Sequence, residues 1–183
     1  MPHVDVHLNA RLQPMHRGER YEEPLEPVLA RLAPGSEVVG GGTLTSEEGE
    51  PLSCDIELHL TDDGMAHATE LIGALESLGA PRGSTWSVGD GTPVPFGTSE
   101  GVAVYLNGTD LPDEVYRDND VNDLISQLLD RVGDEGDLHS WWEGPHESAL
   151  YLYGRSAAVI KDRGADVLAV HPLAQRCRIV DLT

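Results

Sequence analysis

The feature that most constrains the fold of this chain is a run with apolar residues at every second position, which occurs at corresponding places in both of its halves. In residues 3–12, Val4, Val6 and Leu8 face one way and polar side chains face the other. In residues 101–107, Val102, Val104 and Leu106 likewise occupy every second position, with Ala103 and Tyr105 between them. A period of two residues predicts a β-strand with one buried face. Each half therefore starts with a half-buried strand.

The elements that follow these strands occur in the same order in both halves, which is strand, helix, strand, strand, helix, strand. Helices are predicted where apolar residues recur every three or four positions, and strands where they alternate. The polar stretch 14–23 is predicted to be a loop. The predicted strands cover about 3–12, 36–45, 53–61, 84–88, 101–107, 137–142, 147–153 and 176–182, and the predicted helices cover about 24–32, 63–78, 121–132 and 155–168.

The repeated order predicts two domains in tandem. The Gly- and Pro-rich residues 90–97 are interpreted as a linker between a first repeat, 1–89, and a second repeat, 98–183. The β-α-β-β-α-β order resembles the ferredoxin-like fold, an α+β fold with an antiparallel sheet. This resemblance implies that the first and third strands of each repeat are neighbours and that both helices cover one face. The other face of each sheet would then be open.

The open face of the first repeat would gather three histidines and three carboxylates on neighbouring strands. Such a set could hold a divalent metal or act in acid–base chemistry, but only in a favourable cross-strand register. A solvated polar face and a protein-binding face are the alternatives, with Asp55 and Glu57 as the partner-binding residues. The candidate metal ligands are His3, Asp5, His7 and His59, and the same face would carry Asn9, Arg11 and Thr61.

The corresponding face of the second repeat is aromatic. Tyr105, Tyr151 and Tyr153 would lie side by side, and Trp141 or Trp142 would join them from the next strand. Tyr and Trp dominate the energetics of protein interfaces, so these residues are candidates for partner binding. The alternative is that they pack against the first repeat, so that the sheets are buried between the two repeats.

The charge of the chain excludes several classes of partner. Twelve Lys and Arg residues against 32 Asp and Glu residues give a formal net charge of −20. Binding to nucleic acid or to an anionic membrane requires clustered basic residues, so we expect neither. The same charge suits a basic protein partner, although it could serve solubility alone.

The sequence also indicates a cytoplasmic protein without a cofactor. It has no apolar stretch long enough to span a membrane, and its first residues do not resemble a signal peptide. Cys54 and Cys177 are far apart, which argues against a disulfide scaffold or a zinc site. The run Gly40-Gly41-Gly42-Thr43 lacks the GK[ST] ending of a phosphate-binding loop, and no GxSxG motif is present. Nucleophilic catalysis therefore has no sequence signal.

By size, charge and predicted fold, the chain also resembles small acidic bacterial immunity proteins, which are antitoxins that block a partner toxin. This resemblance implies a non-enzymatic protein that inhibits a basic protein partner. The alternative is a small-ligand-binding protein or enzyme with a pocket between the two sheets. Tyr105, Tyr151 and Tyr153 would line that pocket, with His7 or His59 as acid or base.

Overall fold

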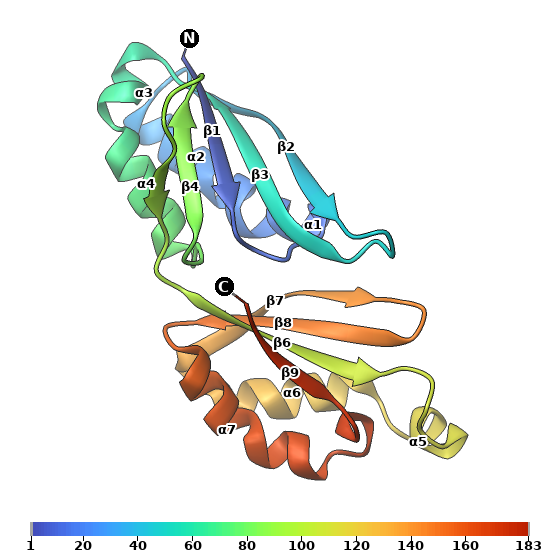
Figure 1. The fold of residues 1–183 in the computed structure, drawn as a ribbon. Coiled ribbons are helices and arrows are strands. Elements are labelled where there is room, and N and C mark those ends of the chain that lie inside the picture. Colours follow the sequence, from blue (N-terminus) through green and yellow to red (C-terminus); the bar gives the residue numbers. More distant parts are fainter. Residues whose placement is uncertain (1, 183) are drawn as a thin grey trace. The chain divides into compact units, whose positions relative to one another are not determined.

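The computed structural model describes residues 2–182, which form two compact units (Figure 1). The first unit contains the residues up to Glu47 and Pro51–Ser99. The second contains Glu100–Leu182 together with the short segment Glu48–Glu50. Among the described residues, no helix is long and apolar enough to cross a membrane.

The first unit is an antiparallel sheet with the strand order β2-β3-β1-β4-β5. Its first and third strands, β1 and β3, are neighbours, as the ferredoxin-like order requires. Alternate residues of β1, namely Val4, Val6 and Leu8, are buried. The strands are β1 His3–Leu8, β2 Glu37–Thr45, β3 Pro51–His59, β4 Ser84–Val88 and β5 Val94–Phe96, and the helical segments are α1 Pro14–Arg17, η1 Gly18–Glu22, α2 Glu23–Leu32, α3 Asp62–Ala66 and α4 Ala68–Ser77.

The prediction of a loop over residues 14–23 is wrong, because this stretch continues into α2 as one helical run. Pro14 lies at the first helical position, where its missing N–H costs nothing. A π-helical turn, η1, follows, and the Glu23 N–H donates to the Gly18 carbonyl directly before Pro24. Tyr21 and Leu25 are buried, so the segment has an apolar side. Charged residues occupy most of positions 17–23, so the sequence pattern did not indicate this apolar side.

Residues 90–97, which we expected to form a linker, include a short strand. β5 pairs antiparallel with β4 and extends the first sheet by one edge strand. Pro95 has no N–H to donate, and an edge strand is one of the few places where a sheet accepts proline. The first unit therefore continues to Ser99.

The second unit repeats the architecture, with the strand order β7-β8-β6-β9 in an antiparallel sheet. Its core is formed by apolar residues of the sheet and of α6 and α7, including Val104, Leu124, Leu128 and Leu152. The strands are β6 Glu100–Asn107, β7 Gly136–Glu143, β8 Glu147–Gly154 and β9 Arg178–Leu182, and the helices are α5 Asp113–Asp118, α6 Val121–Val132, η2 Gly133–Glu135, α7 Ala157–Val170 and η3 Pro172–Ala174. The predicted class, α+β with two antiparallel ferredoxin-like repeats, is confirmed.

The start of α6 depends on Asp120, whose carboxylate accepts a hydrogen bond from the Asn122 N–H at 2.8 Å. We expect Asp120→Ala to destabilise the second unit by about 1 kcal/mol, since it removes this cap. Asp120→Asn keeps a capping oxygen and should cost much less. Urea titrations of the two variants measure the difference. Equal destabilisation by both variants would indicate that the charge matters more than the cap.

Candidate functional site

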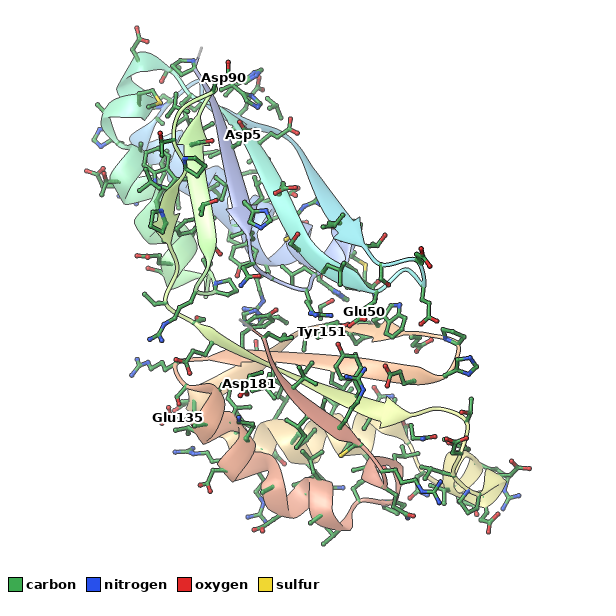
Figure 2. The ribbon with its side chains drawn as sticks, viewed as in Figure 1. Asp5, Glu50, Asp90, Glu135, Tyr151 and Asp181 are labelled. Atoms are coloured by element: carbon green, nitrogen blue, oxygen red, sulfur yellow. The ribbon has the colours of Figure 1, made fainter. Side chains whose placement is uncertain are left out.

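The open face of the first sheet carries the three histidines and three carboxylates that the sequence pattern predicted there. In the β1–β3 register, His3 lies opposite His59, Asp5 opposite Glu57, and His7 opposite Asp55. Figure 2 labels Asp5 on this sheet. Asn9, Arg11 and Thr61 lie just beyond the strand ends.

The side chains on this face form separate pairs. His3 Nε2 lies 2.9 Å from an Asp5 oxygen, and His7 Nδ1 lies 2.8 Å from an Asp55 oxygen. The His3 and His59 rings meet edge to face, with centroids 5.4 Å apart. Among the described residues, no group of three His, Cys, Asp or Glu side chains is arranged to hold a metal ion. The face therefore presents exposed, locally paired polar groups.

The aromatic residues of the second unit lie on two different faces of its sheet. Tyr105 lies opposite Ala149 and Tyr151 opposite Ala103, so both point to one face, which Tyr153 and Trp142 share. Those four side chains are buried. Trp141 lies opposite Leu150 on the other face, and it is 41% exposed. Trp141 is thus the accessible member of the predicted aromatic set.

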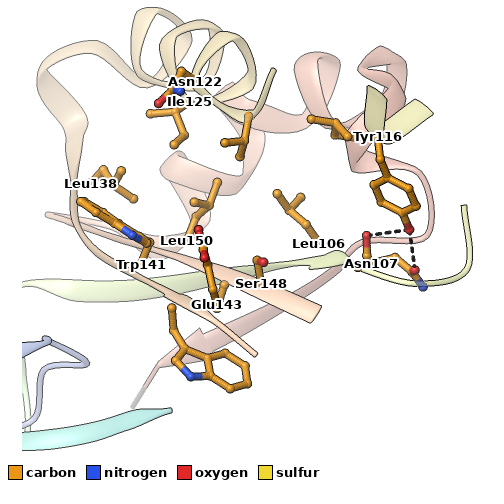
Figure 3. A pocket seen from close by; sticks show the side chains of 15 residues that line it. Leu106, Asn107, Tyr116, Asn122, Ile125, Leu138, Trp141, Glu143, Ser148 and Leu150 are labelled. Carbon is orange, nitrogen blue, oxygen red and sulfur yellow. Dashed lines mark hydrogen bonds between the residues drawn. The ribbon is translucent and has the colours of Figure 1, made fainter. Parts of the chain in front are cut away.

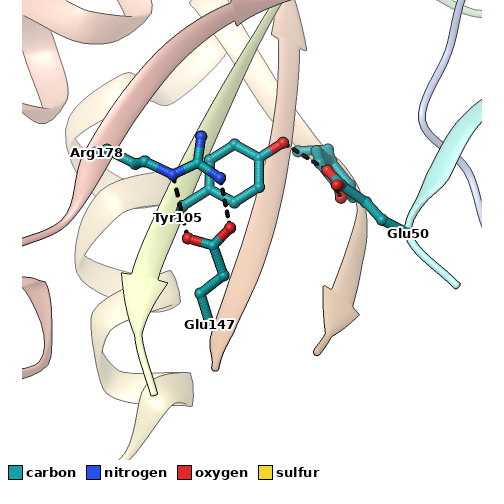
Figure 4. A network of polar contacts seen from close by, with 5 residues as sticks. Glu50, Tyr105, Glu147 and Arg178 are labelled. Carbon is teal, nitrogen blue, oxygen red and sulfur yellow. Dashed lines mark hydrogen bonds and ion pairs between the residues drawn. The ribbon is translucent and has the colours of Figure 1, made fainter. Parts of the chain in front are cut away.

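The buried tyrosines belong to a polar network within the second unit (Figure 4). The hydroxyls of Tyr105 and Tyr151 donate to Glu50 Oε1 at 2.5 and 2.9 Å. The Arg178 guanidinium lies 3.5 Å from the centre of the Tyr105 ring and forms an ion pair with Glu147. The hydrogen bond to Glu147 raises the pKa of Arg178. These contacts occupy the polar groups of Tyr105 and Tyr151 inside the protein.

The second unit contains a pocket of about 630 Å³ between the start of α6 and the neighbouring ends of β6, β7 and β8 (Figure 3). We call it the apolar pocket, because most of its lining side chains are apolar. Trp141 and Val121, at 41% and 39% exposure, are its accessible apolar side chains. The lining residues are Leu106, Asn107, Gly108, Tyr116, Val121, Asn122, Ile125, Leu138, Trp141, Trp142, Glu143, Ser148, Ala149, Leu150 and Leu173.

Local structure explains how these residues come together. Trp141 and Glu143 are two positions apart on β7, so both point to the face of the sheet that α6 covers. Asp120 starts α6 directly before Val121, which sets Val121 and Ile125 along the pocket. The short helix α5 is held against the end of β6 by Tyr116. Its hydroxyl donates to the Asn107 carbonyl oxygen at 3.2 Å and accepts from the Leu111 N–H at 3.0 Å.

The charge around the apolar pocket is negative. Glu143 is its one carboxylate, and no Lys, Arg or His is among the lining residues. A second depression of about 620 Å³ adjoins it and shares Tyr116, Val121 and Leu173. We call this the acidic hollow, because it is lined by Asp118, Asp120 and Asp123 with Arg117 as its one cation.

The cations of the second unit are largely held by its own carboxylates. Arg117 lies 2.7 Å from Asp118, which leaves Asp120 and Asp123 in the acidic hollow without a cationic partner among the described residues. Glu143 likewise has no ion-pair partner in the described part of the chain. Figure 2 labels Glu135 and Asp181, which pair with other cations. The remaining pairs are Lys161–Asp181, Arg163–Glu135 and Arg178–Glu147.

Sequence reasoning identified Trp141 but missed the pocket beside it. Val121 and Ile125 fall in the predicted helix 121–132, and Glu143 lies directly after the predicted strand 137–142. The alternation in Trp141-Trp142-Glu143 could have indicated that Trp141 and Glu143 share a face. The expected pocket, lined by Tyr105, Tyr151 and Tyr153 between two sheets, differs from the apolar pocket, which lies between helix and sheet of one unit.

Comparisons with known proteins do not assign the chain to a family. No family model matches it, and no curated protein matches it significantly. An unknown protein from Galdieria sulphuraria is similar over 99% of this chain and 97% of its own, with 10% identity and a TM-score of 0.33.

Two further solved structures are similar over most of their length. The regulatory subunit of aspartate kinase from Thermus thermophilus shares 12% identity over 91% of this chain and 93% of its own, with a TM-score of 0.28. The first two RRM domains of the yeast poly(U)-binding protein share 11% identity over 98% and 99%, with a TM-score of 0.27. Such distant similarity concerns the fold alone.

Proposed function

We propose that this chain is a non-enzymatic binding protein, of the immunity or antitoxin type, that inhibits a basic protein partner bound at its second unit. The observation that carries the proposal is the apolar pocket beside Trp141, which continues into the acidic hollow. An apolar cavity flanked by carboxylates is complementary to an apolar side chain that is followed by basic residues. Inhibition would follow from steric occlusion of the partner's functional surface.

Two physical effects support this proposal. Burial of apolar surface contributes about 25 cal/mol per Å², so an anchor side chain that fills the apolar pocket supplies affinity. The net charge of −20 attracts a basic partner over a distance and raises the association rate. Asp55 and Glu57 on the first sheet add to this negative field, and the Asp55 side chain is 51% exposed.

The test is capture of a partner by the full chain, followed by affinity measurements with the purified pair. Trp141→Ala should weaken binding by about 30-fold, because truncation of a central aromatic residue typically costs about 2 kcal/mol. Raising the salt concentration should weaken it further, since the attraction is partly electrostatic. Val170→Ala is the matched control, because Val170 is 77% exposed and does not line the pocket.

Three outcomes would contradict the proposal. They are a captured partner that is acidic, an affinity that Trp141→Ala leaves unchanged, and an affinity that is indifferent to salt. A Val170→Ala variant that binds as weakly as Trp141→Ala would also count against a specific role of the pocket.

A second candidate function is the binding of a small molecule in the same pocket. Its volume of about 630 Å³ lies within the range typical of small-ligand sites. A thermal-shift screen of small apolar compounds tests this candidate. Stabilisation that Ile125→Trp abolishes by filling the pocket would favour it, whereas stabilisation that survives in that variant would place the compound elsewhere. His7 and His59, the earlier candidates for acid–base roles, are not among the pocket's lining residues.

A further inference from the structure

The apolar pocket combines apolar walls with a single charged group. Its walls are apolar side chains from α6 and β7, among them Ile125, Leu138 and Trp141, and its one charged lining residue is Glu143. Figure 3 shows Glu143 among the residues that line the pocket. Because Glu143 and Trp141 are two positions apart on one strand face, a group that packs on the indole lies within reach of the carboxylate.

We infer that this pocket is an anchor site for an aromatic side chain whose neighbouring group is cationic, within a basic segment of the partner; the inference rests on the proposed function. The apolar body would pack against Trp141 and Ile125. The cation would meet Glu143, whose charge no lining Lys, Arg or His balances. An anion is disfavoured at the same place, because it would lie beside the exposed carboxylate of Glu143, which has the same sign of charge.

The acidic hollow identifies the occupant as a protein segment. It shares Tyr116, Val121 and Leu173 with the apolar pocket, so a chain leaving the pocket passes directly into it. The Arg117 guanidinium donates twice to Asp118, at 2.7 and 3.0 Å, which leaves Asp120 and Asp123 to attract further basic residues. A single small amine would occupy the pocket and leave the hollow unused.

The charge preference of the pocket can be measured with two small probes that share one apolar body. In amide NMR titrations of the full chain, phenethylamine should shift the signals of Val121, Ile125 and Glu143. 3-Phenylpropionate should bind at least about tenfold more weakly, since its carboxylate faces Glu143. Glu143→Gln should reduce this preference to about threefold or less. Asp130→Asn should retain the preference for the amine. This control variant also removes one negative charge, but from a residue of α6 that does not line the pocket.

A peptide tests the choice of a protein segment over a small amine. Acetyl-Phe-Arg-Ala-Arg-amide should bind at least about tenfold more tightly than phenethylamine, because its arginines reach the acidic hollow. An affinity no better than that of phenethylamine would overturn the assignment to a segment. Equal binding of the two phenyl probes, or a preference that survives Glu143→Gln, would overturn the charge preference.

The failure of this inference is distinguishable from the failure of the proposed function. The inference is contradicted if the small probes and the peptide do not show the expected affinities, even where capture of a partner depends on Trp141. The proposed function fails where capture is indifferent to Trp141→Ala, whatever the probes do.

Discussion

Leu124→Ala is expected to lower the free energy of unfolding of the second unit by about 2–5 kcal/mol. Leu124 is fully buried in the cluster of α6, α7 and the sheet. Truncation removes its contacts and leaves a cavity that tightly packed neighbours refill only in part. Urea unfolding followed by tryptophan fluorescence measures the change. A Trp86→Phe background leaves Trp141 and Trp142 as the reporters, and both belong to the second unit.

Val121→Ala is the matched control for this experiment, since Val121 lies on the same helix and is 39% exposed. Its cost should stay within about 0.5 kcal/mol, which is usual for surface positions. Similar unfolding midpoints for the two variants would contradict the assignment of Leu124 to the core and of Val121 to the open pocket wall.

Cys54 is expected to resist alkylation in the folded protein. Burial raises the pKa of its thiol from 9.0 to about 12. Only the thiolate reacts, so its fraction at pH 8 falls about a thousandfold. Burial also raises the pKa of Cys177, but this side chain is only partly buried and should react first. Iodoacetamide labelling of the native protein, read by mass spectrometry, measures both rates. Equal labelling of the two cysteines would contradict the burial of Cys54.

The same pKa shift has a consequence for stability. A thiol whose pKa is higher in the folded state binds its proton more tightly there, so its contribution is fully present below pH 9. That contribution is lost as the pH rises from 9 towards 12. The urea midpoint should therefore fall over this range, and less steeply in Cys54→Ala. An equally steep fall in Cys54→Ala would assign the pH dependence to other groups.

The predictions from sequence succeeded where a local pattern carried the information. Alternation in residues 3–8 and 53–59 placed His3, His7 and His59 on one face of neighbouring strands, and the β1–β3 register agrees. The loop prediction for residues 14–23 failed because two buried residues, His16 and Tyr21, are separated by a run of charged residues, of which only Glu19 is exposed. A π-helical turn also shifts the usual spacing of a helix face.

The candidate site was harder to predict, because it depends on where three strands and one helix end. Trp141 and Val121 are far apart in the sequence and become neighbours only because α6 begins over the ends of β6 and β7. The same tertiary structure buried Tyr105 and Tyr151, whose alternation alone left open whether they would be exposed. Burial of a side chain depends on what packs against it, which no local pattern records.

The sequence by itself determined the β-α-β-β-α-β order of the main elements, the two repeats and the excess of negative charge. Side-chain periodicity and charge are properties of neighbouring residues, and they persist in any compact state of the chain. The tertiary structure alone decided which aromatic residues are accessible, which carboxylates keep their charge unpaired, and where a cavity remains. Those properties arise from contacts between residues that are distant in the sequence, and they exist only once the chain has packed.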